Sequence, residues 1–208
     1  MKPDYTTIAA CITAVLLLVS SFVYARRTVR GEIDPVPATW VLMMVFLGLS
    51  CFMYWNSPRK SFTGNIALTA GLVNISVIVV GVLYAKRNDA VLFDSYQRLC
   101  LWLSGIIVIF WAITGDQLVS YILLQLVALI AYSATVKKLL TAKEVREPLF
   151  IWVSVLLAAI IAVYPAIVRQ DIYGYIYIAR AVPSTIGIIW LILRVRQKKI
   201  ISTKTETA

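Results

Sequence analysis

Residues 65–85 have the sequence NIALTAGLVNISVIVVGVLYA, a run of 21 positions without a charged side chain. A helix of about 20 apolar residues is long enough to cross the roughly 30 Å hydrocarbon layer of a bilayer. The amide of Asn74 lies near the middle of this run. The stretch therefore predicts a membrane-spanning helix that carries one amide at membrane depth.

Six further apolar stretches accompany it, separated by short breaks that contain proline, glycine or charge, as loops do. They are residues 6–25, 36–55, 99–113, 118–136, 148–168 and 175–195. The fourth segment of the chain, 99–113, is the shortest. The sequence therefore predicts an all-α membrane protein, a single transmembrane domain of seven helices over residues 1–208, ending in a basic tail at 196–208.

The composition requires a bilayer and excludes several classes of protein. Apolar residues make up 61% of the chain and charged residues 14%, whereas soluble domains have about half and a quarter. Histidine is absent, which removes the commonest general base and zinc ligand. Cys11, Cys51 and Cys100 are isolated in apolar runs and are interpreted as packing residues. We expect neither an enzyme nor a site for a metal or cofactor.

The basic residues predict the orientation. Four lie on one side of the seven segments and fifteen on the other, so the net charge of +10 reflects topology and does not indicate nucleic acid binding. The smaller set is Lys2, Arg59, Lys60 and Arg169; the larger is Arg26, Arg27, Arg30, Lys86, Arg87, Arg98, Lys137, Lys138, Lys143, Arg146, Arg194, Arg196, Lys198, Lys199 and Lys204. Since basic loops stay in the cytoplasm, we expect the N-terminus outside and the C-terminus inside the cell (inner) membrane.

Three landmark pairs about 110 residues apart indicate an internal repeat. Basic pairs close the first and fifth segments, a tryptophan follows 13 residues after Arg27 and 14 after Lys138, and the third and seventh segments both end in basic residues. The positive-inside rule alone would also produce the basic landmarks. The pattern predicts a parallel 3+1+3 arrangement: 1–85 as the first repeat, 99–113 as an inverting linker helix and 118–195 as the second repeat.

With this pattern the chain resembles the PQ-loop superfamily, which includes the SWEET sugar transporters. The resemblance rests on residues 34–40 (DPVPATW) before the second helix, 114–116 (TGD) before the fifth and 134–138 (ATVKK) at its end. The signature proline and glutamine of the family are missing, and Ala134 stands where proline would precede Thr135. The resemblance implies seven helices and transport of a small solute by alternating access.

Polar and aromatic residues within the segments are the candidate substrate-binding residues. They are Asn74, Trp40, Trp152, Arg180, Ser184 and Gln125, with Thr135 as a further cavity candidate. Asn74 either joins two helices or faces a cavity. Arg180 either pairs with Asp116 or Asp171, or holds a carboxylate or phosphate at the outer mouth of a cavity. Most of the tyrosines at 173, 175 and 177 are expected to form an interfacial belt.

These residues predict a membrane transporter or facilitator of a small polar solute through a central cavity. The alternative is a non-transporting receptor, assembly factor or scaffold with the same fold. The expected partners are the lipid bilayer and a small polar solute. Whether the protein forms a homo-oligomer is left open.

Overall fold

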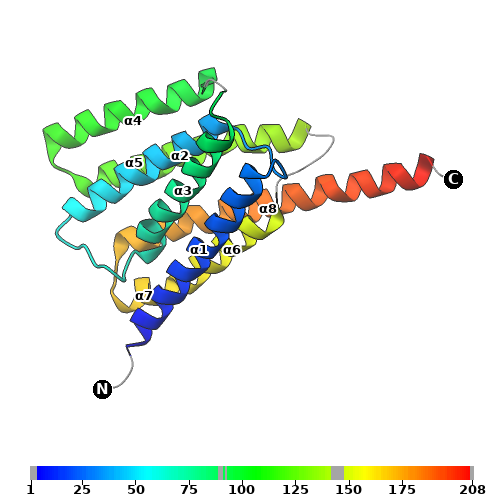
Figure 1. The fold of residues 1–208 in the computed structure, drawn as a ribbon. Helices are drawn as coiled ribbons and strands as arrows, with labels where there is room; N and C mark the ends of the chain where they lie inside the picture. Colours follow the sequence, from blue (N-terminus) through cyan, green and yellow to red (C-terminus); the bar gives the residue numbers. More distant parts are fainter. Residues whose placement is uncertain (1–3, 89–90, 92, 142–147, 207–208) are drawn as a thin grey trace.

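The computed structural model describes residues 4–88, 91, 93–141 and 148–206 (Figure 1). Lys2, Lys143 and Arg146, which contribute to the predicted charge asymmetry, lie outside this part of the chain. So do the side chains of Thr135, Lys137, Lys138, Lys198, Lys199 and Lys204, although their backbone is helical.

The described chain is helical and lacks strands. Its helices are α1 (Tyr5–Val29), α2 (Pro37–Asn56), α3 (Ile66–Ala85), α4 (Ser95–Thr114), α5 (Gln117–Thr141), α6 (Leu149–Ile161), α7 (Val163–Val168) and α8 (Ile172–Glu206). Six spans are long and apolar enough to cross a membrane, with α6 and α7 sharing one, and α5 carries a shorter apolar stretch. The all-α class and the membrane-spanning character are thus confirmed, and each predicted segment falls on a helix.

Two helices extend beyond the predicted apolar segments. The fourth helix begins at Ser95 because Asp94 and Gln97 form a capping box: the Gln97 amide donates to Oδ1 of Asp94 at 2.7 Å, and the Asp94 amide donates to Oε1 of Gln97 at 3.0 Å. The seventh predicted segment, α8, continues past residue 195 to Glu206. No glycine or proline interrupts the basic stretch after 195, so the predicted tail is helical.

The sixth segment is interrupted where a proline removes a backbone donor. α6 ends at Ile161 and α7 begins at Val163. Pro165 has no N–H to donate to the carbonyl of Ile161, four residues earlier, which accounts for the interruption at Ala162. Pro183 lies inside α8 without ending it.

The helices form two triplets with the same order of neighbours. α3 packs between α1 and α2, and α8 packs between α5 and α6. The triplets meet chiefly through α1 against α6 and α2 against α5, with smaller contacts of α1 with α7 and of α3 with α8. α4 lies against α5 at the side of the bundle (Figure 1). The internal repeat stays a prediction, and this order of neighbours is the relevant observation for it.

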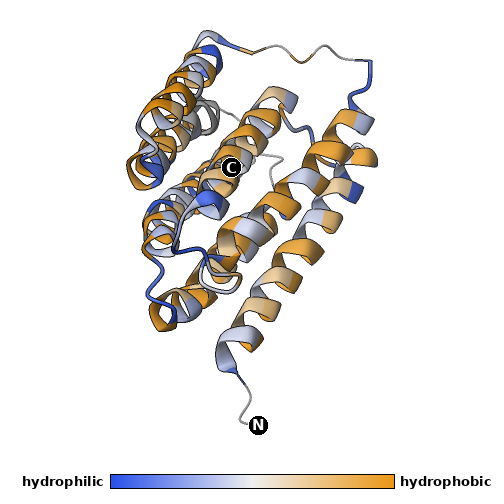
Figure 2. Cartoon of the chain, turned by 90° about the vertical axis from the view of Figure 1, so that its left-hand side faces the viewer, coloured by the Kyte–Doolittle hydropathy of each residue, from blue (hydrophilic) through white to orange (hydrophobic). Residues whose placement is uncertain are grey.

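The outer surface of the bundle is suited to lipid. Large apolar side chains such as Trp102, Ile113 and Val80 are mostly exposed. Apolar residues run along the helices, while hydrophilic residues gather toward their ends and in the loops (Figure 2). Such a contiguous apolar exterior fits a bilayer and does not fit water.

Small residues bring α1 and α3 into close contact. A Cβ atom added at Gly81 of α3 would lie 2.6 Å from Cβ of Ala25 on α1. Real Cβ atoms do not approach so closely, so this crossing requires glycine. Glycine at a helix interface allows membrane helices to pack backbone to backbone.

Candidate functional site

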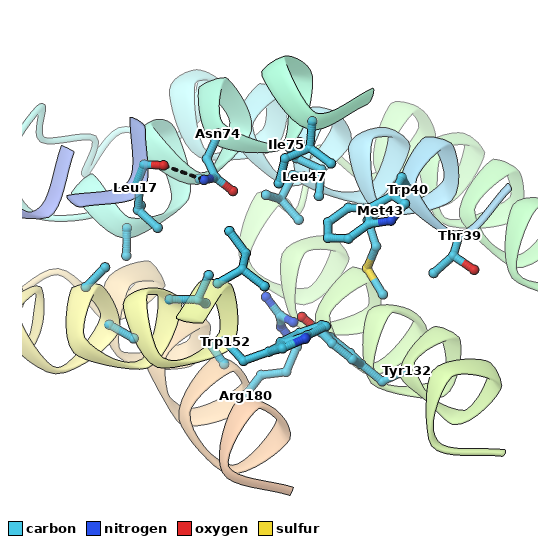
Figure 3. Close-up of a pocket in the computed structure, with 18 of the residues that line it drawn as sticks. Leu17, Thr39, Trp40, Met43, Leu47, Asn74, Ile75, Tyr132, Trp152 and Arg180 are labelled. Atoms are coloured by element: carbon cyan, nitrogen blue, oxygen red, sulfur yellow. Dashed lines mark hydrogen bonds between the residues drawn. The ribbon is translucent and has the colours of Figure 1, made fainter. Parts of the chain in front are cut away.

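A cavity of about 270 Å³ lies between the two triplets (Figure 3). Its walls come from both halves of the chain, with Trp40, Met43 and Asn74 on one side and Trp152 and Arg180 on the other. Val36 and Asp94 also line it, and both are exposed at the beginnings of α2 and α4. The cavity therefore extends to the surface at the end of the bundle where α2 begins.

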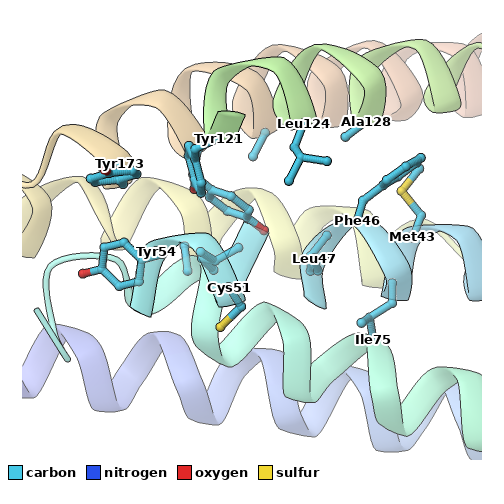
Figure 4. Packing of buried hydrophobic residues seen from close by; sticks show 14 of the residues in the cluster. Met43, Phe46, Leu47, Cys51, Tyr54, Ile75, Tyr121, Leu124, Ala128 and Tyr173 are labelled. Carbon is cyan, nitrogen blue, oxygen red and sulfur yellow. The ribbon is translucent and has the colours of Figure 1, made fainter. Parts of the chain in front are cut away.

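The opposite end, where α2 finishes, is closed by a hydrogen-bonded cluster. The Tyr54 hydroxyl donates to Oδ2 of Asp171 at 2.6 Å, and the Ser61 amide donates to the same hydroxyl at 2.7 Å. Tyr173 packs edge to face against Tyr54 and Tyr121, with ring centroids 5.6 and 5.0 Å away. The three tyrosines sit together at one end of the packed core (Figure 4), so the described side chains pack closely at this end.

Glycines let the loops at the closed end meet. A Cβ at Gly174 would lie 2.8 Å from the carbonyl oxygen of Gly64, and a Cβ at Gly64 would lie 2.6 Å from Oδ2 of Asp171. Gly64 precedes α3 and Gly174 lies in the first turn of α8. The close approach thus joins the segment before α3 to the first turn of α8.

Arg180 lies deep in the bundle. It is eight residues into α8, about 12 Å along the helix axis, and is 8% exposed. Its Nε donates to Oε1 of Gln125 at 2.8 Å, whereas NH1 is buried without a hydrogen-bond partner. The rings of Tyr177 and Tyr132 lie 5.0 and 5.7 Å from the guanidinium carbon.

The predicted ion pair of Arg180 is wrong. Asp171 accepts from the Tyr54 hydroxyl and from the Gly174 amide at 3.0 Å, and Asp116 accepts from the Val119 amide at the start of α5. Both carboxylates are thus engaged near helix ends. The alternative, that Arg180 faces a cavity, agrees with the structure, although Arg180 lies deep in the cavity and not at its mouth.

Gln125 and Ser184 support Arg180 without lining the central cavity. The Gln125 amide nitrogen donates to the Ser50 hydroxyl at 2.9 Å, so Gln125 links Arg180 to α2. The Ser184 hydroxyl donates to the carbonyl of Arg180, one turn back in α8, at 2.7 Å. Both residues border a second cavity, between α5 and α8. Gln125 and Ser184 were candidate substrate-binding residues, but neither lines the central cavity.

Asn74 performs both of its predicted roles. Its Nδ2 donates to the carbonyl of Leu17 on α1 at 2.6 Å. Its oxygen turns from Leu17 toward the cavity (Figure 3). The side chain thus joins α3 to α1 and also lines the cavity.

Trp40 and Trp152 occupy corresponding places in the two halves. Each is the fourth residue of its helix, α2 and α6, and both line the cavity. Trp40 packs on Tyr24 with ring centroids 5.0 Å apart. Nε1 of Trp152 is buried without a hydrogen-bond partner.

Several residues of the site were not predicted. Tyr173 and Tyr177 are 4% and 8% exposed, so the belt interpretation is wrong for both, while Tyr175 is 37% exposed. The signal was available, because 173 and 177 are four apart and share a helix face with Ala181. Tyr54 and Tyr121 gave no comparable signal, since their partners are distant in sequence.

Comparison of the chain with models of protein families, with curated proteins and with solved structures gives no match. Among the described residues, no three His, Cys, Asp or Glu side chains gather where they could hold a metal ion.

Proposed function

We propose that this protein is a membrane transporter or facilitator that moves a small polar solute by alternating access through the central cavity. The observation that carries the proposal is the cavity itself. It lies between two helix triplets and extends to exposed residues at one end, whereas the residues of the hydrogen-bonded tyrosine cluster at the other end do not line it. A site open to one side is what one state of an alternating-access cycle requires.

The proposal includes the parallel 3+1+3 repeat and membership of the PQ-loop superfamily. The shared order of neighbours in the two triplets supports the repeat, since the first helix of each triplet contacts the second helix of the other. The matched places of Trp40 and Trp152, each the fourth residue of its helix, support it as well. In this arrangement α4 is the linker helix that restores the parallel orientation.

Transport in this proposal is uncoupled. Asp171 is the one buried carboxylate in the described part of the chain, and it is held in the closed end by Tyr54. Asp94, the carboxylate of the cavity wall, lies at the exposed mouth and caps α4. Neither group sits beside the deep part of the cavity, where a proton would have to accompany the solute.

Uptake by proteoliposomes tests the proposal. A panel of small neutral, anionic and cationic solutes is offered to the wild-type protein and to Trp40→Ala, which removes a ring from the cavity wall. Trp190→Ala, on a 58% exposed side chain of α8, is the matched control. We expect uptake of at least one solute, reduced in Trp40→Ala and unchanged in the control. Absence of uptake for the whole panel by folded wild-type protein would refute transport.

A non-transporting receptor, assembly factor or scaffold is the second candidate. The observation that favours it is α1, which runs from Tyr5 to Val29 without a proline and lies in backbone contact with α3. The first triplet thus lacks the interruption that Pro165 gives the second. A solute that binds the purified protein but does not cross the membrane would favour this candidate.

A further inference from the structure

Arg180 is a buried cation without a counter-charge in the described structure. No described carboxylate pairs with its guanidinium, since both candidates, Asp116 and Asp171, are bonded elsewhere. Removing a charge from water is costly unless an opposite charge or hydrogen bonds compensate. Gln125 supplies one neutral hydrogen bond and leaves NH1 unsatisfied.

The surroundings of Arg180 fix its orientation. Gln125 is itself held by Ser50, and the rings of Tyr177 and Tyr132 lie against the guanidinium. Figure 3 shows the Arg180 side chain next to Trp152 and Tyr132, and Arg180 is among the residues that line the cavity. A planar guanidinium held in this way presents its remaining donors as a fork, the geometry that binds a carboxylate with two hydrogen bonds.

We infer that the cavity takes a small organic monocarboxylate with an apolar body, and that Arg180 binds its carboxylate. This inference rests on the proposed function and names its substrate class. The charge balance favours a monoanion, because Arg180 is the one cationic side chain among the described residues that line the cavity, and the one carboxylate there, Asp94, lies at the exposed mouth. The solute supplies the missing opposite charge and an acceptor for NH1.

The other walls are suited to an apolar body. Met43, Leu47, Ile75 and Val155 line the cavity together with the rings of Trp40 and Trp152. Polar side chains line the cavity as well, among them Asn74, Thr39 and Gln97, and they are available to a polar substituent on that body. Apolar residues make up the larger part of the lining, and a hydroxyl buried against them without a hydrogen bond costs free energy, which favours a body less polar than a sugar.

A second cavity offers a different route to the same arginine. It measures about 500 Å³, lies between α5 and α8, and Arg180 is the residue that it shares with the central cavity. Leu126 and Ile186 on these helices are about half exposed, so a fatty acid could reach the guanidinium from the bilayer. We infer that the ligand is a water-soluble carboxylate, and the binding test includes a long-chain carboxylate so that a fatty acid from the bilayer can be told apart from it.

Binding to purified protein in nanodiscs tests the inference without requiring transport. Calorimetry compares benzoate, its neutral analogue benzamide and the long-chain carboxylate laurate. We expect benzoate to bind about tenfold or more tighter than benzamide, because a hydrogen bond to a charged group is worth more than one to a neutral group. Arg180→Gln should abolish this preference, and Arg194→Gln, on an exposed arginine of the same helix, should retain it.

The test can be decided even if Arg180→Gln does not fold, because a second variant and a measurement on the wild type are available. If Arg180→Gln does not fold, Arg180→Lys keeps the charge without the fork and should weaken benzoate binding by about tenfold. The comparison of benzoate with benzamide on wild-type protein needs no variant. Equal binding of the two, binding of neither, or a benzoate preference that survives Arg180→Gln would overturn the inference. Tight binding of laurate without benzoate would overturn it in favour of a lipid source.

The two proposals fail in different ways. Benzoate that binds through Arg180 but does not enter proteoliposomes refutes transport and keeps the anion site. Uptake of a neutral solute without benzoate binding keeps transport and refutes the anion site.

Discussion

Tyr54 donates a hydrogen bond of 2.6 Å to Asp171, a residue 117 positions later in the chain. The bond joins the last turn of α2 to the residue before α8, so each triplet contributes one partner. Tyr54 is completely buried and Asp171 is 2% exposed. The closed end of the cavity thus depends on a polar contact shielded from water, where such contacts are worth most.

Removing the Tyr54 hydroxyl should destabilise the protein. Tyr54→Phe keeps the ring but leaves the buried Asp171 carboxylate short of a donor, and we expect a loss of about 1–3 kcal/mol. Unfolding in detergent measures it. Tyr84→Phe, on a 62% exposed ring, should change the free energy of unfolding by less than about 0.5 kcal/mol. An equally small effect for Tyr54→Phe would show that the hydrogen bond does not hold the closed end together.

Asn74→Ala should affect uptake more than stability. The carbonyl of Leu17 that Asn74 contacts also accepts from the Ser20 hydroxyl at 2.9 Å, so it keeps a partner. We expect a stability loss of about 0.6–1.7 kcal/mol, the range for polar contacts between membrane helices, together with a clear loss of solute uptake. Ser76→Ala on the same helix, whose hydroxyl bonds to its own helix, is the control for both measurements. Normal uptake by folded Asn74→Ala would remove Asn74 from the binding site.

Pro165→Ala tests whether the interruption between α6 and α7 serves as a hinge. The alanine amide can donate to the carbonyl of Ile161, so α6 and α7 should join into one helix. We expect slower uptake at unchanged or greater stability, measured as initial rates and by circular dichroism. Pro183→Ala lies in a helix that is already continuous and should leave the rate unchanged. A Pro165→Ala protein with wild-type rates would assign the interruption to packing.

The orientation can be tested with reporter fusions. A reporter active only in the cytoplasm should be active when fused after Ala208 and inactive in the loop around Arg59. The reason is the distribution of basic residues, fifteen against four. Reporter activity at both positions, or at neither, would place them on the same side of the membrane and would contradict the predicted topology of seven crossings.

Asp4 should make stability depend on pH in the acid range. Hydrogen bonds from the side chains of Thr6 and Thr7 hold the pKa of Asp4 below its usual value of 3.8. A carboxyl with a lower pKa in the folded protein stabilises it above the unfolded pKa, and this contribution is lost as the pH falls through the folded pKa. Unfolding followed from about pH 6 to pH 3 should therefore show a decline below about 3.8. Asp4→Asn should lessen that decline, and an identical profile for both proteins would contradict the assignment.

The sequence predicts the spans better than their ends. Long apolar runs determine a helix because the bilayer leaves backbone groups no other partners. The start of α4 was missed because the Asp94–Gln97 capping box lies in a polar stretch that resembles a loop. The end of α8 was missed because charged side chains mark where a helix leaves the membrane, and not where the helix stops.

The cavity residues were predictable one at a time, and their partners were not. Asn74, Arg180, Trp40 and Trp152 are conspicuous because polar and aromatic groups are scarce at membrane depth. That Arg180 contacts Gln125 and not a carboxylate depends on how α5 and α8 pack, which no local pattern encodes. Tyr177 and Tyr132 were overlooked for the same reason, since a tyrosine in an apolar segment looks alike whether it faces lipid or an arginine.

The contact of Gly81 with Ala25 limits how the bundle can move. The close approach of Gly81 and Ala25 limits how far α1 and α3 can slide or rotate against each other at this crossing, so we expect the two helices to move together. Any change that opens the Tyr54 end must then be taken up by the remaining elements: α2, which bears Tyr54, and the second triplet with its interruption at Pro165. The first half of the chain thus contributes a stiff pair of helices, α1 and α3, while the parts able to change shape are α2 and the second triplet.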